Sequence, residues 1–313
     1  MKPPDQDLAG STWRPWSALR GVCLVGVLLI GGGFKACERF RKEPWETAPL
    51  RRDEVETTPL PERAKLAVDR VRFYSNEMKE PRFFLALLPK TEPPPRDVFI
   101  LNHGWFDRPE FLLTELKVDQ IYAELLEQKK VRPAVVVLPD VRFDDFYRRN
   151  REKFPFPNYL TLVAEETSRV VSQKYRVPFS RDHWSLGGFS FGGYLSLDVA
   201  RRYSGRFGSV SVLSSFAEKE WTFWPSAPPP AGKLDAQGRG RQTVVEPGPA
   251  PRIFLACGKD DRLFGRMLAL HENFNRLGVA HEWSTGPGGH TWEYWSSVLR
   301  PMLEFHLAAE VRR

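Results

Sequence analysis

Short, almost continuous apolar runs recur along the chain from residue 97 onward. Such runs, rich in valine, isoleucine, leucine and phenylalanine, are typical of strands that are buried on both faces of a sheet. The runs span residues 97–104, 134–140, 183–188, 209–215 and 252–258. A sixth, AHEWSTG, follows at 280–286. Upstream, the two apolar runs around the polar turn of VDRVRFYSNEMKEPRFFLALLP predict a hairpin at a sheet edge.

Helical patterns separate these runs. Asn158 is placed to cap a helix whose apolar positions fall on one face, namely Leu160, Val163, Val170 and Val171. A second helix ends at Gly278 and carries the apolar stripe Met267, Leu270, Phe274 and Leu277. Because strands alternate with helices, we expect an α/β fold with a mostly parallel, doubly wound sheet and helices on both faces. The ligand site of such a fold lies beyond the carboxyl ends of the strands.

The pattern divides the chain into a tail and one domain. A basic N-terminal region (1–20) leads into an apolar segment (21–36), and a segment rich in proline and charge (37–62) follows. That segment has no apolar period, which predicts a linker. We expect the domain over 63–313, with an insertion at about 216–250 that is aromatic in its front half and rich in proline and glycine in its rear half. The insertion is interpreted as a flap, with a disordered surface loop as the alternative.

The apolar segment is short for a bilayer crossing, and its length suits the core of a signal peptide or signal anchor. Basic residues follow it directly, and the positive-inside rule would keep those residues cytoplasmic. Orientation therefore stays open. We favour an exported domain, periplasmic or membrane-anchored, over a domain on the cytoplasmic face of the membrane or a buried N-terminal helix. Lipidation of Cys37 is a further alternative.

Composition narrows the function classes. The chain has 313 residues, of which 42% are hydrophobic, so it can bury a large core. The net charge of +7 is spread over separated arginines with acidic residues between them, which argues against a nucleic-acid partner. Cys23, Cys37 and Cys257 show no paired spacing, no H-E-x-x-H occurs, and no dinucleotide or P-loop fingerprint is present. We therefore expect no metal and no organic cofactor.

A serine lies between glycines directly after the run at 183–188. In GGFSFGG, the residues Gly188, Ser190 and Gly192 form G-x-S-x-G between a predicted strand and a predicted helix, the pattern of a nucleophile elbow. The turn strains the serine backbone, and side chains at the two glycine positions would clash with the neighbouring strand and helix. The hydroxyl is then exposed at a helix N-terminus, where the dipole favours developing negative charge. A glycine-rich turn with an incidental serine is the alternative.

A serine hydroxyl becomes a nucleophile when a histidine, itself oriented by a carboxylate, accepts its proton. The expected order along this fold is serine, acid, histidine. Asp260 and Asp261 follow the fifth apolar run and His290 follows the sixth, so both partners come at the expected strand ends. We favour Asp261, three residues after Gly258, over Asp260, which could instead cap the next helix.

Two backbone N–H groups are expected to stabilise the oxyanion. One belongs to Phe191, after the serine, and the other to Trp105, in the loop after the strand that ends in NHGW. Gly104 would let this backbone approach the substrate. The Trp105 side chain could also be a core aromatic. His103 competes with His290 as the base, but it precedes the serine, and an H-G pair at this position usually shapes the oxyanion loop.

Four segments carry a family resemblance: VFILNHGW, GGFSFGGYLSLDVARRYSGRFGSVSVLSS, LACGKDD and GGHTWEYWSSVLRPMLEFH. Together they resemble the putative esterase family of α/β-hydrolases, which contains esterase D, feruloyl and acetylxylan esterases, siderophore esterases and mycolyltransferases. The likeness covers roughly Val68 to Leu307. The resemblance implies Ser190 as nucleophile, Asp261 as acid and His290 as base, in agreement with the assignment from the residues.

We therefore expect a serine hydrolase that cleaves a carboxylic ester of a small molecule or glycan through a Ser-Asp-His triad and an acyl-enzyme intermediate. An acyltransferase differs only in the second nucleophile, a sugar or glycerol hydroxyl in place of water. A non-catalytic, membrane-anchored binding protein is the alternative from another class, and its mark would be a missing triad member.

Overall fold

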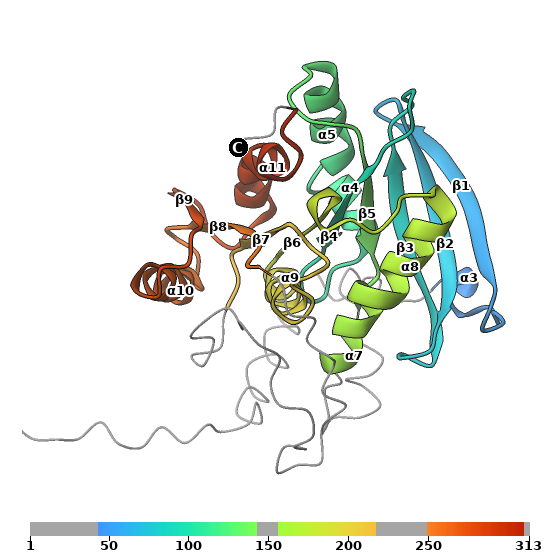
Figure 1. Ribbon diagram of the computed structural model, residues 1–313, viewed down its shortest axis with the longest axis horizontal. Helices are drawn as coiled ribbons and strands as arrows, with labels where there is room; N and C mark the ends of the chain where they lie inside the picture. Colours follow the sequence, from blue (N-terminus) through green and yellow to red (C-terminus); the bar gives the residue numbers. More distant parts are fainter. Residues whose placement is uncertain (1–42, 143–155, 217–248, 310–313) are drawn as a thin grey trace, which may run out of the picture. The chain divides into compact units, whose positions relative to one another are not determined.

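The computed structural model describes residues 43–142, 156–216 and 249–309 (Figure 1). Its centre is a nine-stranded sheet with the strand order β1-β2-β3-β5-β4-β6-β7-β8-β9. The strands are β1 (Val55–Arg63), β2 (Leu66–Ser75), β3 (Glu80–Leu88), β4 (Asp97–Asn102), β5 (Ala134–Pro139), β6 (Trp184–Phe189), β7 (Ser209–Leu213), β8 (Arg252–Gly258) and β9 (Glu282–Gly286).

Strand directions follow the sequence pattern. The first three strands and their contact with β5 are antiparallel, and every pairing from β5 through β4 to β9 is parallel. The predicted hairpin at 68–89 is confirmed as β2 and β3, which pair antiparallel. The expected α/β-hydrolase fold, with a mostly parallel sheet, is likewise confirmed.

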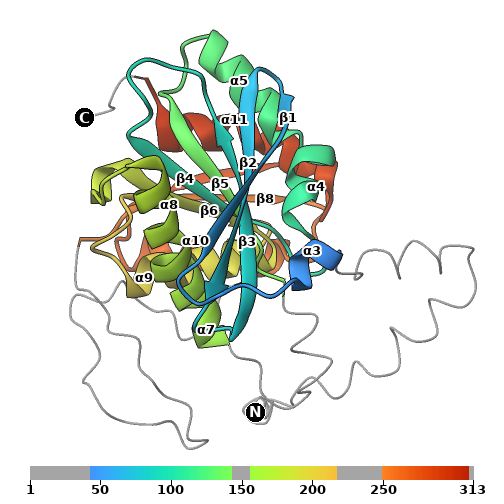
Figure 2. The same ribbon diagram turned by 90° about the vertical axis from the view of Figure 1, so that its right-hand side faces the viewer.

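Helices cover both faces of the sheet. They are α3 (Pro44–Thr47), α4 (Pro109–Thr114), α5 (Val118–Glu127), α7 (Phe156–Thr161), α8 (Ser168–Tyr175), α9 (Phe191–Arg202), α10 (Phe264–Arg276) and α11 (Trp292–Leu307), with a π-helical turn at Leu162–Thr167 between α7 and α8. Figure 1 shows α5 and α11 on one side of the sheet and α9 and α10 on the other, and Figure 2 shows the twist of the strands between them.

The two helical layers enclose two separate apolar cores. Side chains alternate along the buried strand β4, so Val98 and Ile100 join the core under α9 while Phe99 and Leu101 join the core under α11. All four side chains are fully buried. This explains the continuous apolar runs, because a strand that packs against helices on both faces has no solvent side.

Two local predictions were wrong. Residues 55–62 were assigned to a linker, but they belong to β1, which pairs with β2 along the sheet edge. The strand is largely exposed and contains prolines, which an edge strand tolerates, so it shows no apolar period. Asn158 does not cap a helix, because α7 begins at Phe156. Its side-chain amide instead donates to the Glu77 carbonyl.

The apolar segment at 21–36 and almost all of the insertion at 216–250 lie outside the described residues. Within the described ranges, none of the helices has the length and apolar character required to cross a membrane.

Candidate active site

Ser190 occupies the sharp turn between β6 and α9. Its φ of 54° and ψ of −124° lie in a strained region for a residue with a side chain. Glycine is required on both sides of it. A Cβ atom at Gly188 would lie 2.4 Å from the carbonyl oxygen of Gly192, and one at Gly192 would lie 2.2 Å from the carbonyl oxygen of Asn102. The turn therefore has the elbow geometry that the G-x-S-x-G pattern predicts.

Hydrogen bonds to the neighbouring strand fix this turn. The Ser190 N–H donates to the Leu213 carbonyl at 2.8 Å, and the Ser215 hydroxyl donates to the Ser190 carbonyl at 2.7 Å. Both partners come from the end of β7 or the residues after it. Because the backbone is held on both sides, the Ser190 side chain is presented from a rigid platform.

The sheet register brings the other candidate residues to the same edge. Gly188 pairs with Asn102 across β6 and β4, and this places the loop after β4 beside the elbow. Gly258 pairs with Gly286 across β8 and β9, which brings the loops that carry Asp261 and His290 together. Parallel strands thus converge at their carboxyl ends, where the sequence places the polar residues.

His290 lies between Ser190 and Asp261. Its Nε2 is 3.0 Å from the Ser190 Oγ, and its Nδ1 is 3.0 and 3.1 Å from the two carboxylate oxygens of Asp261. Nδ1–H therefore donates to Asp261, which leaves Nε2 as the acceptor for the Ser190 hydroxyl. The ring of Trp295 packs edge to face on the imidazole, with 5.0 Å between ring centres, and restricts its rotation.

Asp261 is ionised in this environment. Burial alone would raise its pKa, but hydrogen bonds from His290 and the Leu263 N–H outweigh burial and lower the pKa below its usual value. The Leu263 N–H lies 2.7 Å from the carboxylate. The Asp261 side chain is completely buried, so its negative charge faces the imidazole without water between them.

Asp260 has different partners from Asp261 and does not contact the imidazole. Its carboxylate is exposed and accepts a hydrogen bond from the Gly288 N–H at 3.0 Å. The Asp260 N–H donates in turn to the Gly288 carbonyl. Asp260 therefore ties the loop after β8 to the loop that precedes His290, while Asp261 contacts the imidazole. Asp260 does not take the alternative role of capping the next helix, because the N-cap residue of α10 is Leu263.

The loop after β4 lies directly beside the elbow. A Cβ atom at Gly104 would lie 3.4 Å from the Ser190 Cβ, and the ring of Trp105 lies 5.8 Å from that of Phe191. The two residues expected to supply oxyanion donors thus flank Ser190. Phe191 is the first residue of α9, so its N–H lies at the amino end of the helix, where the helix dipole favours negative charge.

His103 is part of this loop and does not contact the serine. Its Nε2 accepts from the Val141 N–H at 3.1 Å, so its Nδ1–H donates to the Gly104 carbonyl at 2.8 Å. Burial lowers the pKa of His103 to about 4, which keeps the ring neutral. Because the carbonyl and N–H of a trans peptide point in opposite directions, this bond directs the Trp105 N–H away from the His103 ring.

A buried ion cluster that the sequence did not indicate supports the same loop. Glu46 of α3 accepts from Arg108 at 2.6 Å and from Arg142 at 3.0 Å. Arg108 closes the loop after β4, and Arg142 follows β5, where it also pairs with Asp140 at 2.8 Å. Burial alone would raise the pKa of Asp140, but Arg142 and Arg82 hold it well below its usual range.

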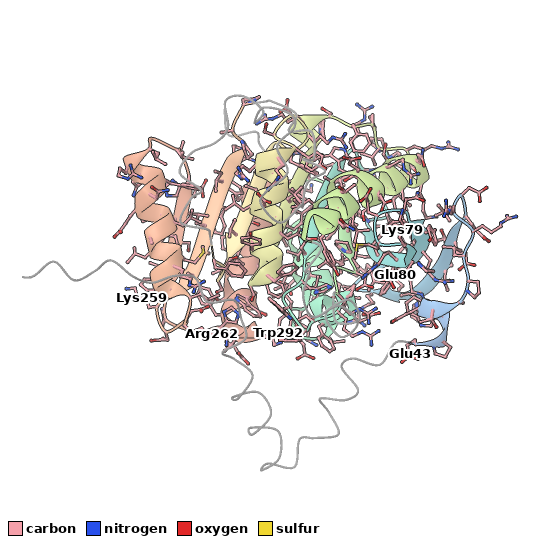
Figure 3. The ribbon with its side chains drawn as sticks, turned by 90° about the horizontal axis from the view of Figure 1, so that it is seen from below. Glu43, Lys79, Glu80, Lys259, Arg262 and Trp292 are labelled. Atoms are coloured by element: carbon pink, nitrogen blue, oxygen red, sulfur yellow. The ribbon has the colours of Figure 1, made fainter. Side chains whose placement is uncertain are left out.

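Figure 3 shows the edge of the molecule at which these loops meet. Lys259, Arg262 and Trp292, which are close in sequence to the Asp261 and His290 loops, lie along the same edge as Glu43 in that view. Across the described ranges, no group of three or more histidine, cysteine, aspartate or glutamate side chains could hold a metal ion.

A doubly wound sheet with a serine on a strained strand-helix turn and an acid-paired histidine beside it defines the α/β-hydrolase class. The Esterase family, described as "Putative esterase", matches residues 75–306, and the chain belongs to this family. It is a carboxylic ester hydrolase.

Individual relatives are distant. An acetyl esterase of Caldicellulosiruptor saccharolyticus is 22% identical over an alignment of 270 residues that covers 77% of this chain and 98% of the relative. A ferulic acid esterase structure superposes with a TM-score of 0.62 at 21% identity, over 79% of this chain and 99% of that one. An S-formylglutathione hydrolase of Staphylococcus aureus superposes with a TM-score of 0.58 at 16% identity, over 82% and 98%. The two structures establish the shared fold.

Proposed function

We propose that this chain hydrolyses carboxylic esters by two-step acyl transfer, with Ser190 as nucleophile, His290 as general base and Asp261 as the residue that orients the imidazole. The observation that carries the proposal is the continuous hydrogen-bonded chain from the Ser190 hydroxyl through His290 to the buried carboxylate. This arrangement gives a weak nucleophile a base in the correct tautomer.

In the first step, Ser190 Oγ attacks the ester carbonyl carbon while His290 Nε2 takes the hydroxyl proton. The tetrahedral oxyanion forms beside Phe191 and Trp105, whose N–H groups are the proposed donors. A donor of this kind is worth about 3 to 4 kcal/mol in the transition state. His290 then passes the proton to the departing alcohol, and the acyl group remains bonded to Ser190.

In the second step, His290 Nε2 takes a proton from water as the water attacks the acyl carbon, and the acid product leaves as Ser190 regains its proton. The ester is proposed to be that of a small molecule or a glycan. Support for this class comes from the relatives, which are named as an acetyl esterase and ferulic acid esterases.

The test is fluorophosphonate labelling of the full chain, with the labelled residue located by peptide mass spectrometry and p-nitrophenyl acetate hydrolysis measured beside it. Ser190→Ala should lose the label and reduce kcat on the order of 10⁴-fold or more. Ser172→Ala, on α8, is the matched control and should keep both. Retained turnover in a folded Ser190→Ala variant would refute the assignment of the nucleophile.

A further inference from the structure

A hollow lies at the opposite end of the sheet from Ser190. It has a volume of about 700 Å³ and sits beside the amino ends of β4 and β6. Two segments distant in sequence meet there, 93–96 and 174–183, and they contribute Arg96, Lys174, Arg176, Ser180 and His183 to the lining. A run of three prolines forms another part of the wall. Since Ser190 follows the carboxyl end of β6, this hollow is separate from the candidate active site.

The lining is cationic and has no carboxylate. In the part of the chain that the structure describes, the guanidinium groups of Arg96 and Arg176 have no ion-pair or hydrogen-bond partner, and the Ser180 hydroxyl has none either. Lys174 has one long ion pair, with Asp69 at 3.9 Å, and its ammonium lies 5.4 Å from the centre of the Tyr175 ring. His183 uses Nδ1 toward Asp97, at 3.2 Å, which leaves its Nε2 available.

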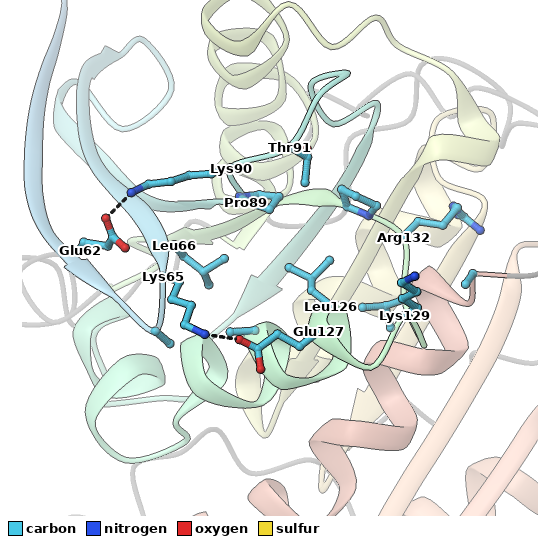
Figure 4. Close-up of a pocket in the computed structure, with 15 residues that line it drawn as sticks. Glu62, Lys65, Leu66, Pro89, Lys90, Thr91, Leu126, Glu127, Lys129 and Arg132 are labelled. Carbon is cyan, nitrogen blue, oxygen red and sulfur yellow. Dashed lines mark hydrogen bonds and ion pairs between the residues drawn. The ribbon is translucent and has the colours of Figure 1, made fainter.

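The hollow shown in Figure 4 provides a contrast. It is also partly lined by cations, but carboxylates lie among them, and Lys65 pairs with Glu127 at 2.7 Å while Lys90 pairs with Glu62. Those lysine charges are therefore balanced within the hollow itself. In the hollow around Arg96, the balancing negative charge is not supplied by the lining.

A helix-dipole explanation covers only part of this arrangement. Lys174 and Arg176 lie at the C-terminal end of α8, where cations are favoured by the helix dipole. Arg96 and His183 lie outside α8, directly before β4 and β6, and this argument does not apply to them. Their convergence with the α8 cations on one proline-walled hollow indicates a site for an external anion.

We propose that this hollow binds a phosphate-type oxyanion, either as a free ion or as the phosphate group of a larger molecule. Guanidinium groups present paired N–H donors in a planar fork that matches two oxygens of a phosphate. Two such forks, an ammonium, a hydroxyl and an imidazole are available in the hollow. The site does not depend on the proposed chemistry at Ser190, so the two proposals can fail separately.

The experiment is isothermal titration calorimetry of the full chain with inorganic pyrophosphate at low ionic strength. We expect saturable binding that weakens as sodium chloride is added, because exposed charges are screened by salt. Arg96→Gln and Arg176→Gln should each weaken binding about tenfold, as expected when one charge-assisted fork is lost. Lys129→Gln removes the same charge from the other hollow and should bind as the wild type does.

Sedimentation with phosphatidylcholine vesicles, with and without phosphatidylglycerol, distinguishes the two sources of phosphate. Arg96-dependent binding to the anionic vesicles would identify a lipid headgroup, and pyrophosphate binding alone would identify a soluble ligand. The proposal is overturned if pyrophosphate and anionic vesicles both fail to bind. It is equally overturned if Lys129→Gln weakens binding as much as the arginine variants, since the effect would then be general surface charge.

Discussion

The two adjacent aspartates offer a sharp test of the proposed mechanism. Asp261 and Asp260 differ by one position, yet the first contacts the His290 imidazole through both carboxylate oxygens and the second bonds to the Gly288 N–H. Asparagine has nearly the shape of aspartate but carries no charge, and half of its head group is a donor. The pair Asp261→Asn and Asp260→Asn therefore applies one chemical change to two structural roles.

At Asp261 we expect kcat to fall by about 10⁴-fold, which corresponds to about 5 kcal/mol of transition-state stabilisation. The side chain is completely buried, so no water replaces the missing charge. In the Asp261→Asn variant only the side-chain oxygen can accept a hydrogen bond, and the Leu263 N–H holds that oxygen. The NH2 group then faces Nδ1 of His290 and favours the wrong imidazole tautomer. KM should change little, because Asp261 acts through His290.

At Asp260 the amide oxygen can still accept from Gly288, and the side chain is exposed, so kcat should stay within about threefold. Steady-state hydrolysis of p-nitrophenyl acetate measures both values, and denaturant unfolding shows whether each variant is folded. If the folded Asp261→Asn variant retained activity within tenfold of the wild type, the orienting role of Asp261 would be wrong. If Asp260→Asn lost more activity, the two roles would be exchanged.

Two further changes test the supports of the site. His103→Asn should reduce kcat by about 10- to 100-fold in the same assay, because the Gly104–Trp105 peptide loses its fixed orientation. The neutral His103 ring stabilises the fold at pH values above 6.5, and this contribution is lost as pH falls toward about 4, so urea unfolding of the variant should depend less on pH across that interval. Glu46→Gln should cost about 2 kcal/mol in urea unfolding by weakening two buried ion pairs, whereas Glu54→Gln, at an exposed pair, should stay within about 0.5 kcal/mol. Equal losses at the two glutamates, or an unaltered kcat in His103→Asn, would contradict the roles given to them.

The elbow and its partners could be predicted because their signals are local. Gly188 is dictated by its contact with Gly192 and Gly192 by its contact with Asn102 on the neighbouring strand, and both requirements appear in the G-x-S-x-G spacing. The order of serine, acid and histidine follows from strand order in a doubly wound sheet. Strands buried on both faces give continuous apolar runs, so the strand ends after which Asp261 and His290 lie could also be predicted. The choice between Asp260 and Asp261 was harder, because it depends on which way a carboxylate turns within one loop.

Features that depend on long-range contacts could not be predicted from the sequence. The edge strand β1 has few buried positions, so neither a strand nor a helical period distinguishes it from a linker. Asparagine is a common N-cap residue, but at Asn158 the helix has already begun, at Phe156. The GGHTWEYW pattern contains Trp295, but it gives no local reason to expect that Trp295, and not Trp292, packs against the imidazole.

Glu46 shows why the start of the domain matters for the site. The sequence interpretation began the domain at residue 63, but the compact unit begins at Glu43. Glu46 joins the loop after β4 to the residue that follows β5 through Arg108 and Arg142. Burial raises the pKa of Glu46 despite both arginines, so desolvation offsets much of the attraction within the cluster. The ion pairs therefore link two loops beside Ser190, and Glu46, which lies upstream of residue 63, belongs to the structure that shapes the active site.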